Sequence, residues 1–114
     1  MSIGSDRIHD ALIVGSGAAG GAAAFHLAAA GHDVVVLERD TELRIKPCGG
    51  GMAASVQQWF PFSLEPAVEQ VIRQVDFSWC LNDPVIAELP GEAPFWIVRR
   101  ELLDQLLSEQ AIQA

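Results

Sequence analysis

Cysteine and basic side chains are scarce in this chain, and each shortage excludes a class of protein. The 114 residues include two cysteines, Cys48 and Cys80, without a Cys-x-x-Cys pair or a nearby pair of histidines. We therefore expect neither a metal site nor a disulfide framework, and this cysteine usage suits a reducing cytosol. Seven Lys and Arg residues stand against 15 Asp and Glu residues, which gives a net charge of −8. Such a chain lacks the basic surface with which proteins bind nucleic acid.

We expect neither a targeting signal nor a membrane span in the N-terminal sequence. The first ten residues carry Arg7 between Asp6 and Asp10 and so lack the positively charged start of a signal peptide. The uncharged stretch over residues 11–30 contains four glycines and His26 instead of a leucine-rich run, which makes it a poor bilayer span. We therefore expect a cytoplasmic protein.

Residues 9–38 have the pattern of a βαβ unit. Asp10–Val14 and residues 33–37 are short apolar runs, typical of strands buried on both faces of a parallel sheet. Between them, Ala18–Ala30 is rich in alanine, the best helix former, and Gly31 provides a natural helix end. The short joints between these segments predict a strand, a helix and a second strand with a right-handed crossover.

The pattern changes after residue 40. Pro47 and three glycines make residues 46–51 a loop, and residues 52–60 fit a short helix. Alternating apolar residues predict strands over 75–81, 85–89 and 95–98, with turns at 82–84 and 90–94, which we interpret as an antiparallel meander within residues 71–98. Leucines on one side of residues 100–113 predict a terminal helix. The predicted fold class is α/β, a Rossmann-like βαβ unit followed by a β-meander and a helix, as an incomplete doubly wound domain over residues 1–114.

The motif Gly15-x-Gly17-x-x-Gly20 lies where the first predicted strand becomes the helix. In a dinucleotide-binding unit the first glycine permits the tight turn, the second lets the backbone approach a pyrophosphate, and the third lets helix and strand touch. Glu38 ends the second strand, where a carboxylate accepts hydrogen bonds from ribose hydroxyls and repels the 2′-phosphate of NADP. The alternative is a glycine-rich helix start that binds nothing.

This motif does not by itself distinguish NAD from FAD, but the residues around it resemble a known family. Asp10–Glu38, Lys46–Gly51 with its Pro-Cys-Gly-Gly-Gly sequence, and Val98–Asp104 are similar to the geranylgeranyl reductase family of flavoproteins. That family has the fold of para-hydroxybenzoate hydroxylase and related FAD monooxygenases. The similarity covers most of this chain but about the N-terminal third of a typical member.

The resemblance assigns cofactor-binding roles residue by residue. The glycine motif would hold the FAD pyrophosphate, Glu38 would bind the adenosine ribose, and Arg39 would lie over the adenine. Arg100 matches an arginine near the FAD phosphates, with Arg99 as the adjacent alternative. Cys48 would lie beside the isoalloxazine ring, either as a catalytic or redox thiol that faces the substrate or as a small filler. The expected cofactor-binding set is Gly15, Gly17, Ala18, Ala19, Gly20, Glu38, Arg39, Cys48, Gly49, Gly50 and Arg100.

The reaction that the resemblance implies is the reduction of carbon–carbon double bonds in a geranylgeranyl chain, with FAD as cofactor and NADPH as transient reductant. The substrate would be an isoprenoid, such as a chlorophyll precursor or an archaeal lipid, and a lipid substrate would bring the full-length protein into peripheral contact with a membrane. Two alternatives stay open. One is an FAD-dependent aromatic hydroxylase of the same fold, and the other is a non-catalytic nucleotide-binding module.

The resemblance also implies that parts of the fold are missing from residues 1–114. A third parallel strand, a Gly-Asp segment that contacts the flavin and the substrate domain would all lie further along the chain. Two strands and one helix cannot cover both faces of a parallel sheet. We therefore expect that the 114 residues alone neither fold cooperatively, nor retain FAD, nor catalyse the reaction.

Overall fold

The computed structural model describes residues 7–41 and 45–114, and the chain divides into two compact units. The first unit consists of Met1–Ile45 and Asp104–Ala114, and the second consists of Lys46–Leu103. Helix α2 (Arg100–Gln113) contributes residues to both units. Neither helix in the described residues is long and apolar enough to cross a membrane.

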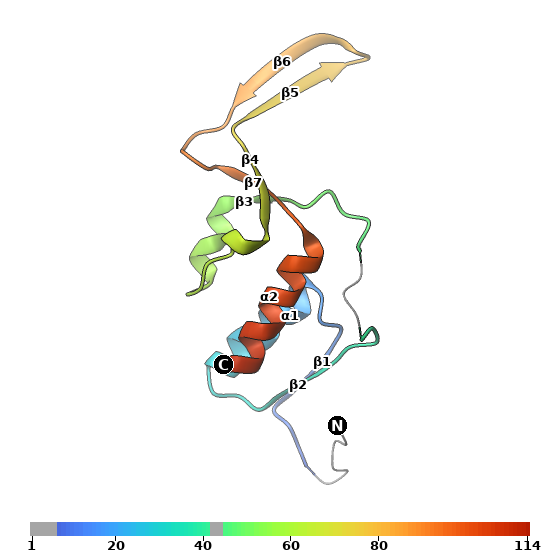
Figure 1. Cartoon of the computed structure of the whole chain (residues 1–114), viewed down its shortest axis with the longest axis vertical. Coiled ribbons are helices and arrows are strands. Elements are labelled where there is room, and N and C mark those ends of the chain that lie inside the picture. The colour runs from blue at the N-terminus through green and yellow to red at the C-terminus, as the bar shows by residue number, and fades with distance from the viewer. Residues whose placement is uncertain (1–6, 42–44) are drawn as a thin grey trace. The chain divides into compact units, whose positions relative to one another are not determined.

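The first unit contains the expected βαβ arrangement (Figure 1). Strand β1 (Ala11–Val14) is followed by helix α1 (Ala18–Ala29) and strand β2 (Val34–Leu37). The two strands are parallel, with Ala11 opposite Val34 and Val14 opposite Leu37. Parallel neighbours need a crossover connection, and here helix α1 provides it. The α/β fold class is thus confirmed.

Helix α1 ends where its sequence predicts. The N–H of Gly31 donates to the carbonyl of Ala28 at 2.9 Å, and the N–H of His32 donates to that of Leu27 at 3.1 Å. This pair of bonds is the Schellman arrangement, which satisfies carbonyl groups that the last turn of a helix leaves without partners. It turns the chain directly into β2.

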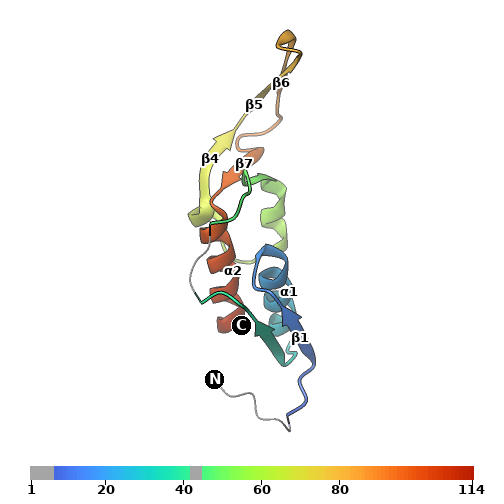
Figure 2. The same ribbon diagram turned by 90° about the vertical axis from the view of Figure 1, so that its right-hand side faces the viewer.

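Strand burial in the first unit differs from the expectation. Ala24 and Phe25 of α1 are buried, but the side chains of Leu12 and Val14 are 62% and 82% exposed, and Leu37 is 42% exposed. These three residues share one face of the β1–β2 pair, because side chains alternate along a strand. The prediction of strands buried on both faces is therefore wrong for the described structure, in which this face of the β1–β2 pair is exposed. Figure 2 shows β1 alongside α1.

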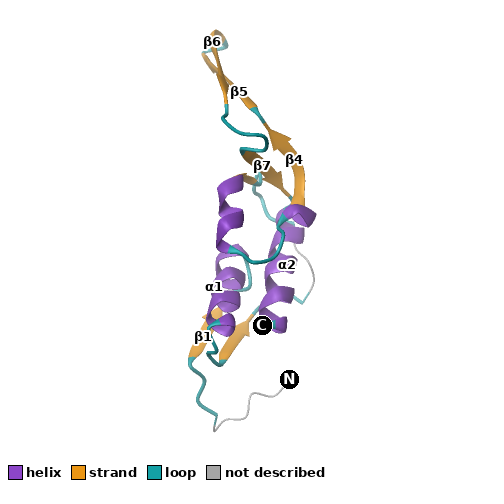
Figure 3. Ribbon diagram, turned by 90° about the vertical axis from the view of Figure 1, so that its left-hand side faces the viewer, coloured by secondary structure: helices purple, strands orange, loops and turns teal. Residues whose placement is uncertain are grey.

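The second unit contains two antiparallel sheets (Figure 3). Strand β7 (Phe95–Val98) lies between β3 (Gly51–Ala53) and β4 (Val68–Ile72) in a three-stranded sheet. Strands β5 (Gln74–Trp79) and β6 (Asn82–Glu88) form a separate hairpin. Two short 3₁₀ helices, η1 (Ala54–Trp59) and η2 (Glu65–Ala67), connect β3 to β4. Leu64, Ala67, Trp96, Val98 and Leu103 are buried here.

The meander predicted over residues 71–98 is therefore wrong in its third pairing. Strands β5 and β6 do pair, but β7 pairs with β3 and β4 instead of continuing from β6. Strand β4 and the strand character of Gly51 were not expected, and the predicted helix over residues 52–60 is a 3₁₀ helix limited to Ala54–Trp59. Partners for β7 come from segments far apart in sequence, which short-range patterns do not reveal.

The hairpin turn lies two residues earlier than expected. Trp79 pairs with Asn82, so Cys80 and Leu81 form the two-residue turn, with φ angles of +47° and +62°. Asp83 and Pro84 lie in β6, where the pairing register shifts between Phe77 and Trp79. Such a bulge tolerates proline because the residue needs no ladder hydrogen bond there. The Asn-Asp-Pro sequence thus marks a bulge and not the turn.

Candidate cofactor-binding site

The first glycine of the motif makes the turn out of β1. Gly15 has a φ angle of +96°, which side chains rarely tolerate, and its N–H donates to the carbonyl of Leu37 at 2.7 Å. This bond ties the start of the loop to the end of β2. Among the described residues, apart from its two chain neighbours, a Cβ atom at Gly15 would meet no atom within 4 Å. The backbone conformation, and not crowding, is therefore what requires glycine at this position.

The third glycine of the motif brings helix and loop into contact. A Cβ atom on Gly20 would lie 1.9 Å from the carbonyl oxygen of Gly15 and 3.4 Å from Cγ2 of Ile13. The first distance is far below any allowed contact, so no side chain fits at this position without movement of the backbone. Gly20 thus has the close-packing role that the sequence pattern predicts for it.

The start of helix α1 is open to an anion. Gly17 is the N-cap residue, no side chain caps the helix there, and the first turn contains no acidic residue. The N–H groups of the first turn of a helix lack intrahelical partners, and the helix dipole places positive potential at this end. Ala18 and Ala19 lie in this turn and add no bulk beyond a methyl group. A phosphate group fits these donors.

Glu38 is held against the glycine loop by two hydrogen bonds from Ser16, and a third hydrogen bond comes from Asp40 in its own segment. Its Oε2 accepts the backbone N–H of Ser16 at 2.7 Å and the Ser16 hydroxyl at 2.9 Å, and its Oε1 accepts the N–H of Asp40 at 3.0 Å. The bond from Asp40 and the two from Ser16 lower the pKa of Glu38 to about 2. The side chain is exposed and ionised at neutral pH, so it presents a fixed carboxylate to solvent.

A cavity of about 680 Å³ in the first unit is lined by both Ser16 and Glu38. Residues of α1, β2 and the C-terminal half of α2 complete its wall, among them Ala24, Val34 and Ser108. Small-molecule sites in proteins have volumes of roughly 300–1,000 Å³. The structure therefore brings together the glycine motif and Glu38, as predicted, and adds Ser16, which sequence reasoning missed because the motif leaves its position unspecified.

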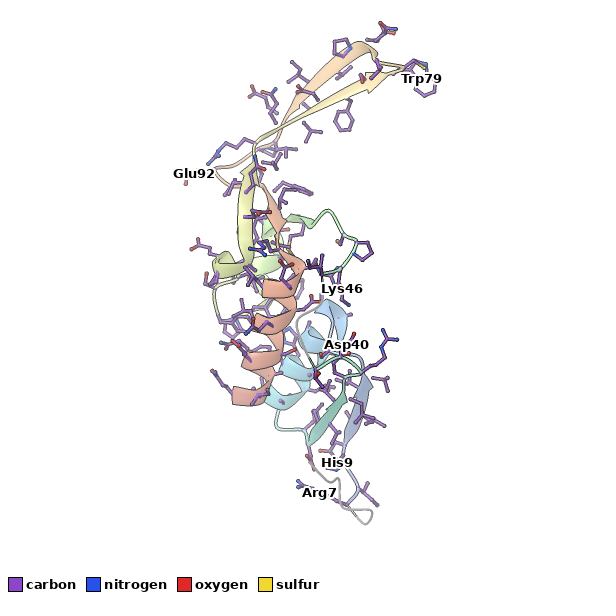
Figure 4. All side chains as sticks on the ribbon, turned by 45° about the vertical axis from the view of Figure 1, so that its right-hand side comes forward. Arg7, His9, Asp40, Lys46, Trp79 and Glu92 are labelled. Atoms are coloured by element: carbon purple, nitrogen blue, oxygen red, sulfur yellow. The ribbon has the colours of Figure 1, made fainter. Side chains whose placement is uncertain are left out.

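Arg39 is exposed to solvent. Its side chain is 79% exposed, and its Nε lies 3.6 Å from Oδ1 of Asp40, whose position beyond β2 is marked in Figure 4. An exposed ion pair of this kind contributes little to stability. Arg39 directly follows Glu38 in the sequence. Its contact with the adenine stays a prediction.

The glycine loop of the second unit is fixed to strand β7. Gly50 has a φ angle of +76°, and a Cβ atom there would lie 2.0 Å from the carbonyl oxygen of Val98. The carbonyl of Gly50 accepts a hydrogen bond from the N–H of Val98 at 2.9 Å. The N–H of Gly50 donates to Sγ of Cys48 at 3.4 Å. Cys48 and Gly49 are exposed. The loop thus lies beside the end of β7, directly before the two arginines.

Arg99 and Arg100 stand at the junction of β7 and α2. The Arg99 guanidinium pairs with Glu101, with Nε donating to Oε1 at 2.8 Å. The pKa of the Glu101 carboxyl is lowered chiefly by a hydrogen bond from its own backbone and next by the hydrogen bond from Arg99. Arg100 is the first residue of α2 and is half-buried. This geometry does not choose between the two arginines as the phosphate contact, so the assignment of Arg100 stays a prediction.

The described residues hold no group of three or more His, Cys, Asp or Glu side chains arranged to bind a metal ion. The residues that carry the expected chemistry fall into two sets. Gly15–Gly20 and Glu38 belong to the first unit, whereas Cys48–Gly50, Arg99 and Arg100 belong to the second.

Comparison with curated proteins finds flavoproteins along almost the whole chain. A probable electron transfer flavoprotein-quinone oxidoreductase, YdiS, of Escherichia coli K12 is 32% identical and covers 96% of this chain. The chloroplastic geranylgeranyl diphosphate reductase of Oryza sativa subsp. japonica is 36% identical over 87% of this chain. This chain spans 28% and 21% of the lengths of these two relatives, respectively.

Solved structures share the fold. A geranylgeranyl bacteriochlorophyll reductase-like protein of Thermoplasma acidophilum superposes with a TM-score of 0.79 at 21% identity, over 92% of this chain and 28% of its own. The myxobacterial chondrochloren halogenase CndH superposes with a TM-score of 0.76 at 22% identity, over 92% of this chain and 26% of its own. At these identities the likeness concerns the fold alone.

A family assignment follows from the sequence profile, the relatives and the geometry together. The profile of the FAD dependent oxidoreductases matches residues 10–105, which include the glycine motif, Glu38 and the loop at Cys48. The curated relatives include geranylgeranyl reductases, as the resemblance in the sequence predicted. This chain therefore belongs to the FAD dependent oxidoreductase family.

Proposed function

We propose that this chain is the N-terminal, FAD-binding part of a reductase that saturates carbon–carbon double bonds of a geranylgeranyl group with electrons from NADPH. The observation that carries the proposal is the 36% identity to the rice geranylgeranyl diphosphate reductase over 87% of the chain. The Pro47–Gly51 loop supports it, because this loop is the part of the sequence that resembles the reductases in particular.

FAD would supply hydride transfer to the double bond, and the chain would supply position. In the first unit, the N–H groups at the start of α1 would bind the pyrophosphate, and the Glu38 carboxylate would bind the adenosine ribose. The helix orients the N–H groups, and hydrogen bonds orient the carboxylate. Little conformational entropy is therefore lost when the cofactor binds. Arg39 would contact the adenine from its exposed position beside Glu38.

The second unit would meet the flavin ring. Gly49 is exposed and has no side chain, so the backbone there could approach the isoalloxazine closely, with the buried Gly50 holding the loop against Val98 and the exposed thiol of Cys48 facing the substrate. Arg100, or Arg99 beside it, would neutralise part of the pyrophosphate charge. The role of the Cys48 thiol in this scheme is to contact the substrate next to the reacting bond.

An anaerobic assay tests the proposal. Full-length protein reconstituted with FAD is mixed with NADPH and a geranylgeranyl lipid, and mass spectrometry measures the gain of two hydrogens for each reduced double bond. We expect saturation that depends on NADPH. Glu38→Arg should abolish FAD retention with little damage to the second unit, and Cys48→Ser should slow saturation while FAD occupancy stays unchanged.

Several results would contradict parts of this scheme. Unchanged flavin occupancy in Glu38→Arg would refute the assignment of Glu38 to the ribose site. An unchanged rate of double-bond saturation in Cys48→Ser would show that the Cys48 thiol only fills space. The purified 114-residue chain is expected to show no sharp thermal transition and no retained flavin; a sharp transition with bound FAD would contradict this expectation.

The 32% identity to YdiS favours a second candidate, in which the protein reduces a quinone. The same assay separates the two: a quinone reductase forms a quinol and leaves prenyl double bonds intact. Oxygen consumption with a hydroxylated product would instead support the aromatic hydroxylase of the same fold. A non-catalytic nucleotide-binding module would bind FAD and turn over none of these substrates.

A further inference from the structure

The hairpin of β5 and β6 forms a sheet of its own with one apolar face. Phe77 pairs with Val85, and Trp79 follows Phe77 by two positions on β5, at the far end of that strand (Figure 4). Because side chains alternate along a strand, these three residues share one face of the hairpin. Phe77, Val85 and Trp79 are 58%, 61% and 77% exposed, respectively. A two-stranded hairpin with such an open apolar face is marginally stable in water, which favours a partner for this surface.

The apolar surface continues around the turn, where the backbone is strained. Leu81 is 95% exposed, and the preceding Cys80 is exposed as well. Cys80 and Leu81 have φ angles of +47° and +62°, at positions where Asn-Gly fits with least strain. Exposed apolar side chains and unfavourable backbone angles both cost free energy in water, and they persist where they serve a contact. These features favour a contact made by residues 77–82, which we call the tip.

The charges around the tip limit the kind of partner. Residues 77–82 contain no charged side chain, and residues 74–88 contain Asp76, Asp83 and Glu88 but no Lys or Arg. These three carboxylates repel an anionic surface, whether it is a nucleic acid or a layer of acidic lipids. A surface without net charge fits the tip, and the Trp79 indole adds the N–H donor that aromatic side chains use at a membrane–water interface.

The distance from the turn to the first carboxylate fits shallow insertion into a bilayer. Asp83 follows Leu81 by two residues, which at about 3.3 Å per residue gives roughly 7 Å. Helices that lie in the interface bury their apolar face by about 5–10 Å, whereas the hydrocarbon core is about 30 Å thick. At the shallower depth the backbone groups of the turn still reach water, which the hydrocarbon core would deny them. The tip therefore has the length to enter the interface and not to span a membrane.

We propose that the tip of the β5–β6 hairpin is a docking surface for a bilayer of zwitterionic lipids. The inference rests on the proposed function for its choice of partner, because the apolar chain of a geranylgeranyl lipid holds the substrate in a bilayer. Trp79 and Leu81 enter the interface, and Asp76, on the opposite face of the hairpin, stays in water. Docking brings the protein to the surface from which its substrate is drawn.

The test uses the full-length protein reconstituted with FAD and vesicles of phosphatidylcholine. Sedimentation with the vesicles measures the partition coefficient of the wild type and of two tip variants. Leu81→Asn removes the apolar side chain without further strain, because asparagine tolerates a positive φ angle. Trp79→Thr removes the indole and keeps a residue that is common in strands. Each variant should partition at least about tenfold more weakly, the effect of one large apolar side chain that no longer leaves water.

Ile86→Thr is the matched control for the tip variants. Ile86 is 61% exposed, as Val85 is, but it pairs with Asp76 on the opposite face of the same hairpin. Its replacement should change the partition coefficient by less than about twofold. The ratio between wild type and Leu81→Asn should be the same in low and high salt, because an apolar contact is not screened. All three variants should retain FAD as the wild type does, which shows that they are folded.

Footprinting with hydroxyl radicals tests the state of the tip in the full-length protein. Without vesicles, Trp79 should be oxidised as readily as Trp59, which is 65% exposed, and vesicles should protect Trp79 alone of the two. If Trp79 is instead as protected as the buried Trp96 before vesicles are added, another part of the protein covers the tip and the inference is wrong. Equal partition of the wild type and both tip variants would overturn it as well.

Activity measurements separate this inference from the function on which it rests. Saturation of a geranylgeranyl lipid held in vesicles should slow in Leu81→Asn, whereas saturation of the same lipid dispersed in detergent should not change. If both rates are unchanged, the proposed function stands and the inference is wrong. If the tip binds vesicles as expected but no lipid is reduced in either form, the proposed reaction is wrong and the docking surface is supported by itself.

Discussion

Gly20 in the first unit and Gly50 in the second perform the same physical task with different sequence signals. A Cβ atom at either glycine would lie about 2 Å from a carbonyl oxygen: 1.9 Å from that of Gly15 and 2.0 Å from that of Val98, respectively. Gly20 meets a residue five positions away within one motif, whereas Gly50 meets a residue 48 positions away on another strand. The spacing of residues within one motif predicts the first contact, whereas the second contact depends on how distant segments of the chain pair.

Replacement of each glycine by alanine tests the comparison between Gly20 and Gly50 most strongly. Gly20→Ala should destabilise the first unit, and Gly50→Ala the second, by about 3 kcal/mol or more, because backbone must move to admit the methyl group. Residue-resolved amide hydrogen exchange on the full-length protein should show the loss of protection in the unit that carries the change.

Gly49→Ala is the matched control for both variants. In the part of the chain that the structure describes, a Cβ atom there would have nothing within 4 Å apart from its chain neighbours. The free energy of opening measured by exchange should therefore change by less than about 0.5 kcal/mol. Equal loss of protection in both units from either variant would mean that the two units do not open independently, and the comparison between them would fail.

The sequence predicts the first unit well because its signals are short-range. A strand, a glycine motif, an alanine-rich helix with a Gly31 end and a valine-rich strand follow one another within residues 10–38. Their parallel pairing and the contact between loop and Glu38 then follow from the βαβ geometry. Ser16 is the exception, since nothing in the motif indicates that its hydroxyl reaches the carboxylate.

The second unit is less predictable for reasons that particular residues show. Strand β4 has apolar residues at Val68, Val71 and Ile72, without strict alternation, because the pairing with β7 shifts between Val68 and Gln70. The partners of β7 are separated from it by the whole hairpin, so periodicity within any one segment cannot identify them. The pattern of β5 and β6 alone is local enough to predict their pairing.

Acid should affect the first unit more than the second. The pKa of Glu38 is lowered from 4.5 to about 2 by its bonds to Asp40 and Ser16, so its stabilising contribution is complete above pH 4.5 and is lost as the pH falls through about 2. The pKa of Asp33, lowered chiefly by its hydrogen bond from His9, gives the same unit a second contribution with the same sign.

NMR titration of the Glu38 carboxyl carbon and the Ser16 amide proton measures this effect directly. Both signals should titrate together with a midpoint near pH 2, and Glu38→Gln should remove the transition at Ser16 while that of Asp33 persists. A Glu38 midpoint at its ordinary value, with the Ser16 signal unaffected, would contradict the hydrogen-bonded geometry of the loop.

The smallest effect is expected at the hairpin, where local sequence opposes the structure. Cys80 and Leu81 both adopt positive φ angles in the turn, a conformation that two-residue hairpin turns require and that Asn-Gly accommodates best. Leu81 is 95% exposed, and neighbouring Trp79 lies at the far end of β5 with 77% exposure (Figure 4), so replacing the turn removes no packing. The double substitution Cys80→Asn and Leu81→Gly should therefore stabilise the hairpin by about 1 kcal/mol.

Hydrogen exchange at the amides that join β5 and β6 would measure that gain, with Cys80→Ser alone as a control that leaves both backbone angles unrelieved. The gain should stay within the hairpin, and FAD retention by the full-length protein should not change. Loss of the hairpin pairing in the double variant would instead show that the turn lies at Asn82–Pro84, where the sequence pattern places it. In that case the second unit would follow local signals as closely as the first, and the difference between the two would lie in the sheet partners of β7 alone.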